Sequence, residues 1–161
     1  SLIDRIVSRG GMVKNLHGQK NLYYQVNATY YSALGESDEK MLLARAIQMF
    51  MPGKPQVWYL DLFAGKNDHE AVRRAGESGH KEINRTNLST DQIAEDLKKD
   101  VVQKQLALIR MRNTHKAFSE GAEVAISGGE SSLQIRWEYN SAFATLNVNF
   151  ESGTYTIVES R

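Results

Sequence analysis

The chain has 161 residues, of which 41% are hydrophobic and 24% are charged, and its 20 basic and 19 acidic side chains give a formal net charge of +1. These values suit one globular domain, or a piece of a larger one, and argue against disorder, a fibrous repeat or a coiled coil. The near-neutral charge offers no bulk attraction to nucleic acid or to a membrane surface, so neither is expected as a partner. The absence of cysteine excludes a disulfide framework and a thiolate metal site, and it favours a cytoplasmic protein.

A short amphipathic helix is expected over residues 1–9. Its apolar stripe ends at Arg9 and Gly10, a typical signal for a helix C-terminus, and Ser1 can cap its first turn. Because the stripe begins at Leu2 with no methionine before it, we expect the chain to start inside a larger fold.

The next segment, residues 10–21, is rich in glycine and cationic side chains and is expected to be a loop. Glycine lets backbone amides approach an anion that the cations neutralise, so an anion-binding site is one interpretation; a solvated loop is the more common alternative. The candidate anion-binding side chains are Lys14, His17 and Lys20. Residues 22–31 follow as a tyrosine-rich predicted strand, whose tyrosines could line a sugar or nucleobase site or pack in a core.

Residues 37–51 are predicted to form a heavily buried helix with Ser37 as its cap. The turn Pro52-Gly53-Lys54-Pro55 ends this helix and leads into Gln56–Leu60, an apolar run without alternation that is typical of a strand buried on both faces of a parallel sheet. A helix, a turn and such a strand make one step of a (β/α) barrel. Since barrel chemistry lies beyond the carboxyl ends of the strands, residues 61–68 are where a site is expected first.

Three further helices are predicted before residue 118. Asp68 can cap a short one that ends at Arg74, and residues 90–98 and 101–112 form the other two. The connection over residues 75–88 is long, polar and irregular, which is uncommon inside a compact domain and is often functional. The basic residues near the end of the last helix complement its dipole, and no nucleic-acid-binding module accompanies them.

From residue 119 the hydrophobic period changes to two. Four short strands are expected over residues 122–126, 132–139, 142–149 and 154–158, joined by turn residues, as in an antiparallel meander. We therefore predict an α/β fold in which residues 1–118 are the last steps of a (β/α)8 TIM barrel and residues 119–161 are a small antiparallel β domain.

The sequence lacks the common catalytic and cofactor motifs, including the nucleotide-binding glycine loops, the zinc-protease helix motif and the hydrolase nucleophile elbow. Its four histidines are scattered, so no metal, no cofactor and no catalytic residue is assigned. Residue pattern alone places a ligand side near residues 21–25 and 61–85, and it gives no reaction.

A series of segments in uninterrupted order resembles the carboxyl-terminal part of the sucrose phosphorylase group in glycoside hydrolase family 13. The matching segments are Tyr24-Gln25-Val26-Asn27, Thr29 to Leu34, Leu43 to Gln48, Pro52 to Val57, Leu62 to Asp68, Ile83-Asn84-Arg85, Asp100 to Val102 and Arg112 to Thr114. The resemblance implies a (β/α)8 enzyme, a hexosyltransferase, that transfers glucose from an α-glucoside to inorganic phosphate with retention and yields α-glucose 1-phosphate.

Retaining transfer requires a nucleophilic carboxylate and a carboxylic acid/base about 5 Å apart. In the family that the chain resembles, these carboxylates lie on earlier barrel strands. We therefore expect a fragment that lacks them and is inactive alone, with the amino-terminal remainder of the enzyme or a second copy as its partner. The alternative is a non-catalytic carbohydrate-binding or interaction domain.

The resemblance also implies which residues bind substrate. Tyr24 and Gln25 match an acceptor-site loop and, with Tyr23, form one candidate group. The segment that ends at Ile83-Asn84-Arg85 matches a glucose-binding loop, so Asn84 and Arg85 are candidates there. Lys81 is a further candidate, standing where the family has an arginine, which keeps the charge without the bidentate fork.

Three positions depart from the sucrose-specific pattern that the resemblance implies. Leu22 replaces an aspartate that grips fructosyl hydroxyls, and Trp58 and Asp61 replace the usual tyrosine and glycine. Loss of a carboxylate suits an acceptor that is itself an anion, so glucosylglycerate is favoured as the substrate, with sucrose next; fructose phosphate also stays open as an acceptor. Among the candidate cations named above, one or more would neutralise the phosphate or the glycerate.

Overall fold

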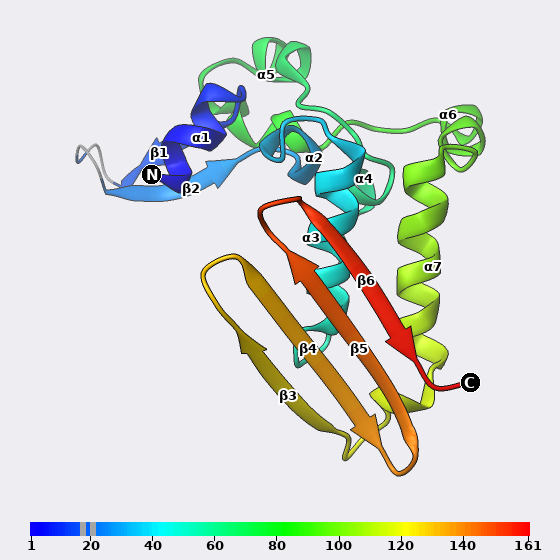
Figure 1. The fold of residues 1–161 in the computed structure, drawn as a ribbon. Helices are drawn as coiled ribbons and strands as arrows, with labels where there is room; N and C mark the ends of the chain where they lie inside the picture. The colour runs from blue at the N-terminus through cyan, green and yellow to red at the C-terminus, as the bar shows by residue number, and fades with distance from the viewer. Residues whose placement is uncertain (17–18, 20–21) are drawn as a thin grey trace. The chain divides into compact units, whose positions relative to one another are not determined.

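The computed structural model describes residues 1–16, 19 and 22–161, which form two compact units. Unit 1 comprises Ser1–Asp38 and Val57–Val102, and unit 2 comprises Glu39–Gln56 and Gln103–Arg161. Each unit is therefore assembled from two separate stretches of chain, whose elements can be followed in Figure 1. The boundary expected after residue 118 remains a proposal about the whole protein.

Unit 1 begins with α1 (Leu2–Ser8), where Ser1 and Asp4 form the capping box at the N-terminus. The strands β1 (Met12–Asn15) and β2 (Tyr23–Asn27) then pair antiparallel. Residues 12–15 were expected to be loop, and that expectation was wrong because strand pairing with β2 overrides the weak local pattern. The predicted strand over residues 22–31 is also too long, since Thr29 caps a short helix, α2 (Tyr30–Ala33).

The rest of unit 1 is helical, with α4 (Tyr59–Leu62), α5 (His69–Ala75), the 3-10 helix η2 (Gly76–Asn84) and α6 (Thr90–Asp96). The strand predicted over Gln56–Leu60 is absent: residues 56–58 have no regular structure and the chain turns into α4. A strand needs neighbours that accept and donate its backbone hydrogen bonds. No parallel strand pair occurs within the described part of the chain, so the barrel steps remain a proposal.

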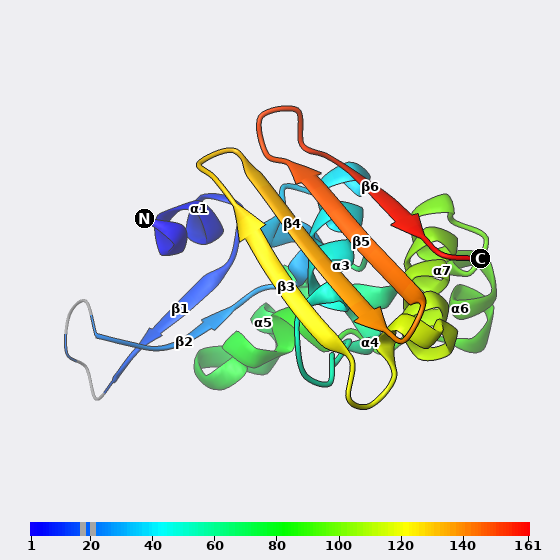
Figure 2. The same cartoon turned by 60° about the horizontal axis from the view of Figure 1, so that its bottom comes forward.

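Unit 2 contains most of α3 (Asp38–Phe50) and of α7 (Asp100–Thr114), the 3-10 helix η3 (Lys116–Phe118) and a four-stranded sheet. Its strands are β3 (Glu123–Gly128), β4 (Ser132–Tyr139), β5 (Ala142–Asn149) and β6 (Thr154–Glu159), antiparallel in that order. The predicted meander is thus confirmed. Figures 1 and 2 both show α3 against one face of this sheet.

The core of unit 2 forms where the inward face of the sheet meets α3. Inward residues alternate along β4 and β5, and Ile135 lies opposite Leu146 while Trp137 lies opposite Ala144; all four are buried.

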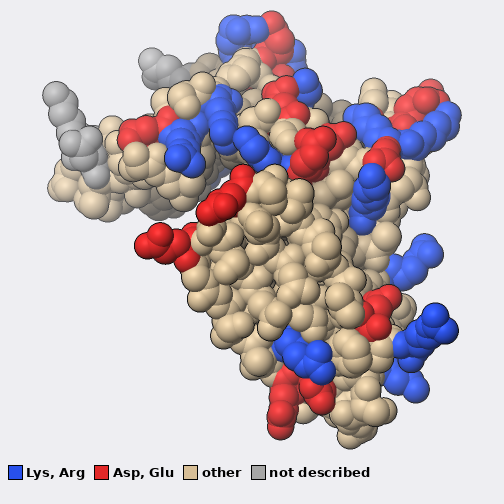
Figure 3. All heavy atoms as spheres, in the orientation of Figure 1, with Lys and Arg blue, Asp and Glu red and all other residues tan. Residues whose placement is uncertain are grey.

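The outward face of the sheet carries few charged side chains, and elsewhere in Figure 3 acidic and basic residues are intermixed. Within the described residues, no helix has the length and apolarity needed to cross a membrane.

Candidate functional site

Unit 1 contains a polar hollow of about 230 Å³, lined by residues from β2, from the segment before α4 and from the end of η2 and the residue after it. The lining residues are Gln25, Asn27, Trp58, Lys81, Asn84 and Arg85. Four of these, Gln25, Lys81, Asn84 and Arg85, are the substrate-binding candidates that the resemblance implied. The structure therefore brings together side chains that are widely separated in the sequence.

The remaining candidates lie at or beyond the edge of this hollow. Tyr23 and Tyr24 lie on β2 without lining it, and their side chains are 40% and 59% exposed. Lys14 lies on β1 directly opposite Gln25, so their side chains share one face of the two-stranded sheet. His17 and Lys20 lie outside the described residues.

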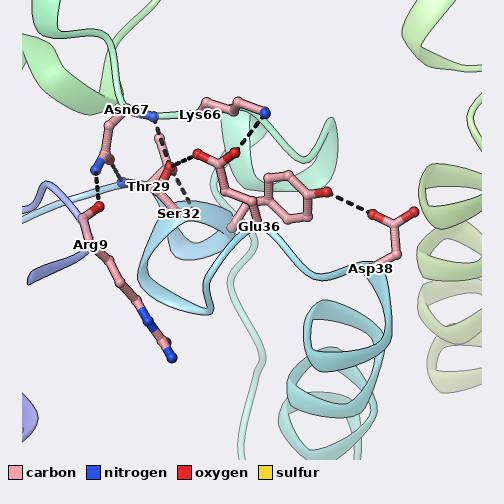
Figure 4. A network of polar contacts seen from close by, with 8 residues as sticks. Arg9, Thr29, Ser32, Glu36, Asp38, Lys66 and Asn67 are labelled. Carbon is pink, nitrogen blue, oxygen red and sulfur yellow. Dashed lines mark hydrogen bonds and ion pairs between the residues drawn. The ribbon is translucent and has the colours of Figure 1, made fainter. Parts of the chain in front are cut away.

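The end of β2 is held in place by the polar network drawn in Figure 4. The Asn67 side-chain oxygen accepts a hydrogen bond from the Thr29 N–H (2.7 Å), and the Asn67 N–H donates to the Ser32 hydroxyl (3.0 Å). Thr29 is completely buried, and Ser32 nearly so. Because these bonds join the β2 exit to the loop before α5, they fix the strand that carries Gln25 and Asn27.

Residues 61–68 were expected to be the first place for a site, but the two carboxylates there serve the backbone. Asp61 accepts a hydrogen bond from the Tyr30 N–H (2.7 Å), and Asp68 caps α5 by accepting from the Ala71 N–H (2.8 Å). Neither lines the hollow. An aspartate after an apolar run can be a helix cap as readily as a ligand, and the sequence does not distinguish the two roles.

The far wall of the hollow is fixed by side-chain hydrogen bonds to backbone carbonyls. The Trp58 indole N–H donates to the Asn84 carbonyl (2.9 Å), and the Asn84 side-chain amide donates to the Ala28 carbonyl (3.3 Å). Thr86 donates to Asp68 (3.1 Å), which anchors the residues that follow η2. The Asn84 side chain is thus oriented with its amide nitrogen engaged, leaving its oxygen as the end that can accept a further bond.

Positive charge gathers at one side of the hollow. The pKa of His80 lies below its ordinary value because of desolvation and because of repulsion from the Lys14 and Lys81 ammonium groups. No ion pair with an acidic side chain involves Lys81 among the described residues, whereas Arg85 lies 3.7 Å from the Glu82 carboxylate. This imbalance of charge favours an anionic ligand.

Sequence reasoning missed two residues at this site. Asn27 is buried, with 8% of the residue exposed, and its side-chain amide nitrogen has no hydrogen-bond partner within the described residues. Its position two residues after Gln25 on a strand was the only available signal, because such residues point to the same face. The His80 Nε2 atom lies 3.3 Å from the Gln25 side-chain oxygen, and no local sequence pattern predicts that contact.

The Asp68 cap should make stability depend on pH. Hydrogen bonds from Ala71 and then from Thr86 hold the pKa of Asp68 below its ordinary value of 3.8. Its stabilising contribution is therefore present above that ordinary value and is lost as the pH falls from there through the lowered pKa of the folded state. Asp68→Ala should lower the free energy of unfolding by about 0.5–2 kcal/mol at neutral pH. Urea denaturation at a series of pH values should show this difference shrinking below about pH 4.

A matched control for that experiment is Asp91→Ala, which removes an exposed aspartate from the first turn of α6. It should have the smaller effect, because Asp91 gives up only its interaction with the helix dipole. A difference between wild type and Asp68→Ala that stays constant down to acid pH would contradict the role of the ionised cap.

Comparison with known proteins gives a consistent set of relatives. No protein-family model matches the chain. The chain is 52% identical over 160 residues to a sucrose 6(F)-phosphate phosphorylase of Ilumatobacter coccineus, covering 98% of this chain and 30% of that protein. It is 44% identical to a sucrose phosphorylase of Agrobacterium vitis, covering 85% of this chain and 28% of that protein. The crystal structure of sucrose 6F-phosphate phosphorylase from Thermoanaerobacter thermosaccharolyticum matches with a TM-score of 0.92 and 38% identity, over 99% of this chain and 32% of that one.

The relatives that these matches identify are all sugar phosphorylases. The chain belongs to the sucrose phosphorylase-like family, which confirms the resemblance seen in the sequence. It spans about a third of the length of the relatives that it matches. A glucosylglycerate phosphorylase of Escherichia coli is only 26% identical over 82% of this chain, so similarity does not single out the glycerate substrate favoured from the sequence.

Proposed function

We propose that this chain is the carboxyl-terminal part of a retaining α-glucoside phosphorylase, an enzyme that transfers glucose to inorganic phosphate and yields α-glucose 1-phosphate. The observation that carries the proposal is the hollow of unit 1, where Gln25, Lys81, Asn84 and Arg85 line one small polar space. Amide and cationic groups of this kind bind sugar hydroxyls and phosphate oxygens. The chain contributes this binding wall, and the nucleophilic carboxylate and the acid/base come from the rest of the protein.

The departing group is an anion on this proposal. Desolvation, and then the nearby Lys14 and Lys81 ammonium groups, lower the pKa of His80, so two cations lie near this side of the hollow. Leu22 stands at the position where the resemblance implies an aspartate that grips a neutral fructosyl group. A phosphate ester of sucrose is the first candidate, because the relative at 52% identity and the solved structure are both described as acting on sucrose 6F-phosphate. Glucosylglycerate, favoured from the sequence, becomes the second candidate, since its carboxylate is also an anion.

The partner of this chain is the amino-terminal remainder of the same enzyme. Trp58 is 48% exposed, and its backbone is extended (φ −70°, ψ 137°), close to the polyproline-II conformation. Val26 and Tyr24, on the face of β2 opposite to Gln25, are exposed as well. Exposed apolar side chains beside an unpaired extended segment suit burial against neighbouring barrel strands.

The substrate assignment is tested by the initial rates of phosphorolysis of the full-length protein on sucrose 6F-phosphate, glucosylglycerate and sucrose. We expect kcat/KM to be about 10- to 100-fold higher on the two anionic glucosides than on sucrose, because hydrogen bonds to a charged group contribute free energy of that size to binding. A preference for sucrose would contradict an anionic departing group. Phosphorolysis of none of the three would contradict the function itself and favour a binding domain without catalysis.

A further inference from the structure

His80 makes a contact that neither the sequence pattern nor the resemblance pointed to. Its Nε2 lies 3.3 Å from the Gln25 side-chain oxygen, which joins η2 to β2 across a sequence separation of 55 residues. Because an amide oxygen only accepts hydrogen bonds, this contact requires the tautomer in which Nε2 carries the proton and donates it. Gln25 lines the hollow, whereas His80 is not among its lining residues. The contact therefore links a candidate ligand-binding side chain to a group outside the binding space.

The backbone holds His80 firmly in this place. Gly79, immediately before it, is buried, and a Cβ atom there would lie 2.6 Å from the Ala75 Cβ and 2.7 Å from the Val72 carbonyl oxygen. Only glycine allows η2 to approach α5 so closely. The part of η2 around Gly79 is thus packed on α5, which fixes the position from which the imidazole reaches Gln25.

The bond to His80 decides which end of the Gln25 carboxamide is available. The two ends differ, because the oxygen only accepts hydrogen bonds and the NH₂ group only donates them. With the oxygen engaged by His80, the NH₂ group is left for an acceptor such as a sugar or phosphate oxygen. Desolvation, with Lys14 and Lys81 nearby, lowers the pKa of His80, so at neutral pH the ring is uncharged and acts as a simple donor.

We infer that His80 is a positioning residue for the proposed reaction: it holds the Gln25 carboxamide so that its NH₂ group faces the departing sugar in the hollow. This inference rests on the proposed function. A long glutamine side chain loses rotational freedom when a ligand fixes it, and this loss opposes binding. A donor that fixes this side chain before the ligand binds strengthens the contact between Gln25 and the ligand, although the donor itself does not touch the ligand.

The inference is tested in the full-length protein by comparing His80→Phe, which keeps a flat ring without the donor, with His80→Gln, which restores a donor. Losing one net hydrogen bond should lower kcat/KM for phosphorolysis about two- to tenfold in His80→Phe, and His80→Gln should recover part of the loss. In the Gln25→Ala background the same His80→Phe change should have almost no effect. The control is His69→Phe on α5, outside the hollow, which should leave kcat/KM unchanged.

An equal loss from His80→Phe with and without Gln25 would overturn the inference, and so would a wild-type rate in His80→Phe. Crystal structures of the full-length wild type and His80→Phe give a second measurement that does not depend on activity. We expect one conformer of the Gln25 side chain in the wild type and several in the variant. The same single conformer in both proteins would overturn the inference, whether or not the protein has phosphorylase activity. Absence of phosphorylase activity would instead contradict the proposed function.

Discussion

Replacing Trp137 by alanine is expected to lower the free energy of unfolding of unit 2 by about 3–5 kcal/mol, as large aromatic deletions in well-packed cores do. The indole is 7% exposed, and its N–H donates to the Phe50 carbonyl at 2.6 Å. Its ring centroid lies 5.4 Å from that of Phe118, and the Arg112 guanidinium carbon lies 4.3 Å from the indole centroid. The substitution would therefore remove apolar burial, a buried hydrogen bond and a cation–π contact together.

Two further variants separate these contributions. Trp137→Phe keeps a ring but leaves the Phe50 carbonyl without its donor, so it should cost less than alanine and about 1–3 kcal/mol. Tyr139→Ala, at the exposed end of the same strand, should cost the least. Urea denaturation of the full-length protein followed by far-ultraviolet circular dichroism measures all three; equal losses for Trp137→Ala and Tyr139→Ala would contradict the central place of the indole in this core.

Replacing Lys81 by methionine is expected to lower kcat/KM for phosphorolysis about 10- to 100-fold, because a hydrogen bond to a charged group contributes about 1.5–3 kcal/mol. Lys81 lines the hollow and lies near His80, and within the described residues no acidic side chain forms an ion pair with it. Its charge is therefore available to substrate. Methionine keeps the length of the side chain and removes only the ammonium group.

Lys81→Arg and Lys98→Met complete this experiment. Arginine stands at this position in the family that the chain resembles, so Lys81→Arg should keep most of the activity. Lys98→Met removes a surface ion pair with Glu95 and should leave kcat/KM unchanged. Wild-type kinetics in Lys81→Met would show that the hollow is not part of the substrate site.

The sequence predicted best those elements whose signals are local. Ser1, Asp68 and Ser89 each cap the helix that was expected to follow them, because a cap needs only a side-chain oxygen and the backbone amides two or three residues later. The β3–β6 meander was likewise predicted by alternation and turn residues, since adjacent strands pair with one another.

The errors arose where structure depends on distant partners. Residues 56–60 read as a buried strand, but they lack the neighbouring strands that would pair with them in the described residues, and Tyr59–Leu62 is helical. The strand β1 and the 3-10 helix η2 had no clear pattern of their own, and both are defined by contacts with β2 and α5. Propensity over a short window cannot report such contacts.

Some residues of the candidate site were predicted from the sequence, and others were found only in the structure. Gln25, Lys81, Asn84 and Arg85 were reached through family resemblance, and their roles remain predictions although they line one hollow. Asn27 and His80 were missed, because a buried unpaired amide and a contact to Gln25 across 55 residues exist only in three dimensions. Asp61 and Asp68 were noticed for their position after an apolar run, and they serve as hydrogen-bond acceptors for backbone amides instead.

The most direct test is to follow the reaction by phosphorus and proton NMR spectroscopy while the full-length protein acts on sucrose 6F-phosphate in the presence of inorganic phosphate. If unit 1 forms one wall of a retaining phosphorylase site, α-glucose 1-phosphate will accumulate as inorganic phosphate is consumed, and fructose 6-phosphate will be released with it. Formation of the β-anomer, or release of free glucose at a rate that does not depend on phosphate, would contradict it.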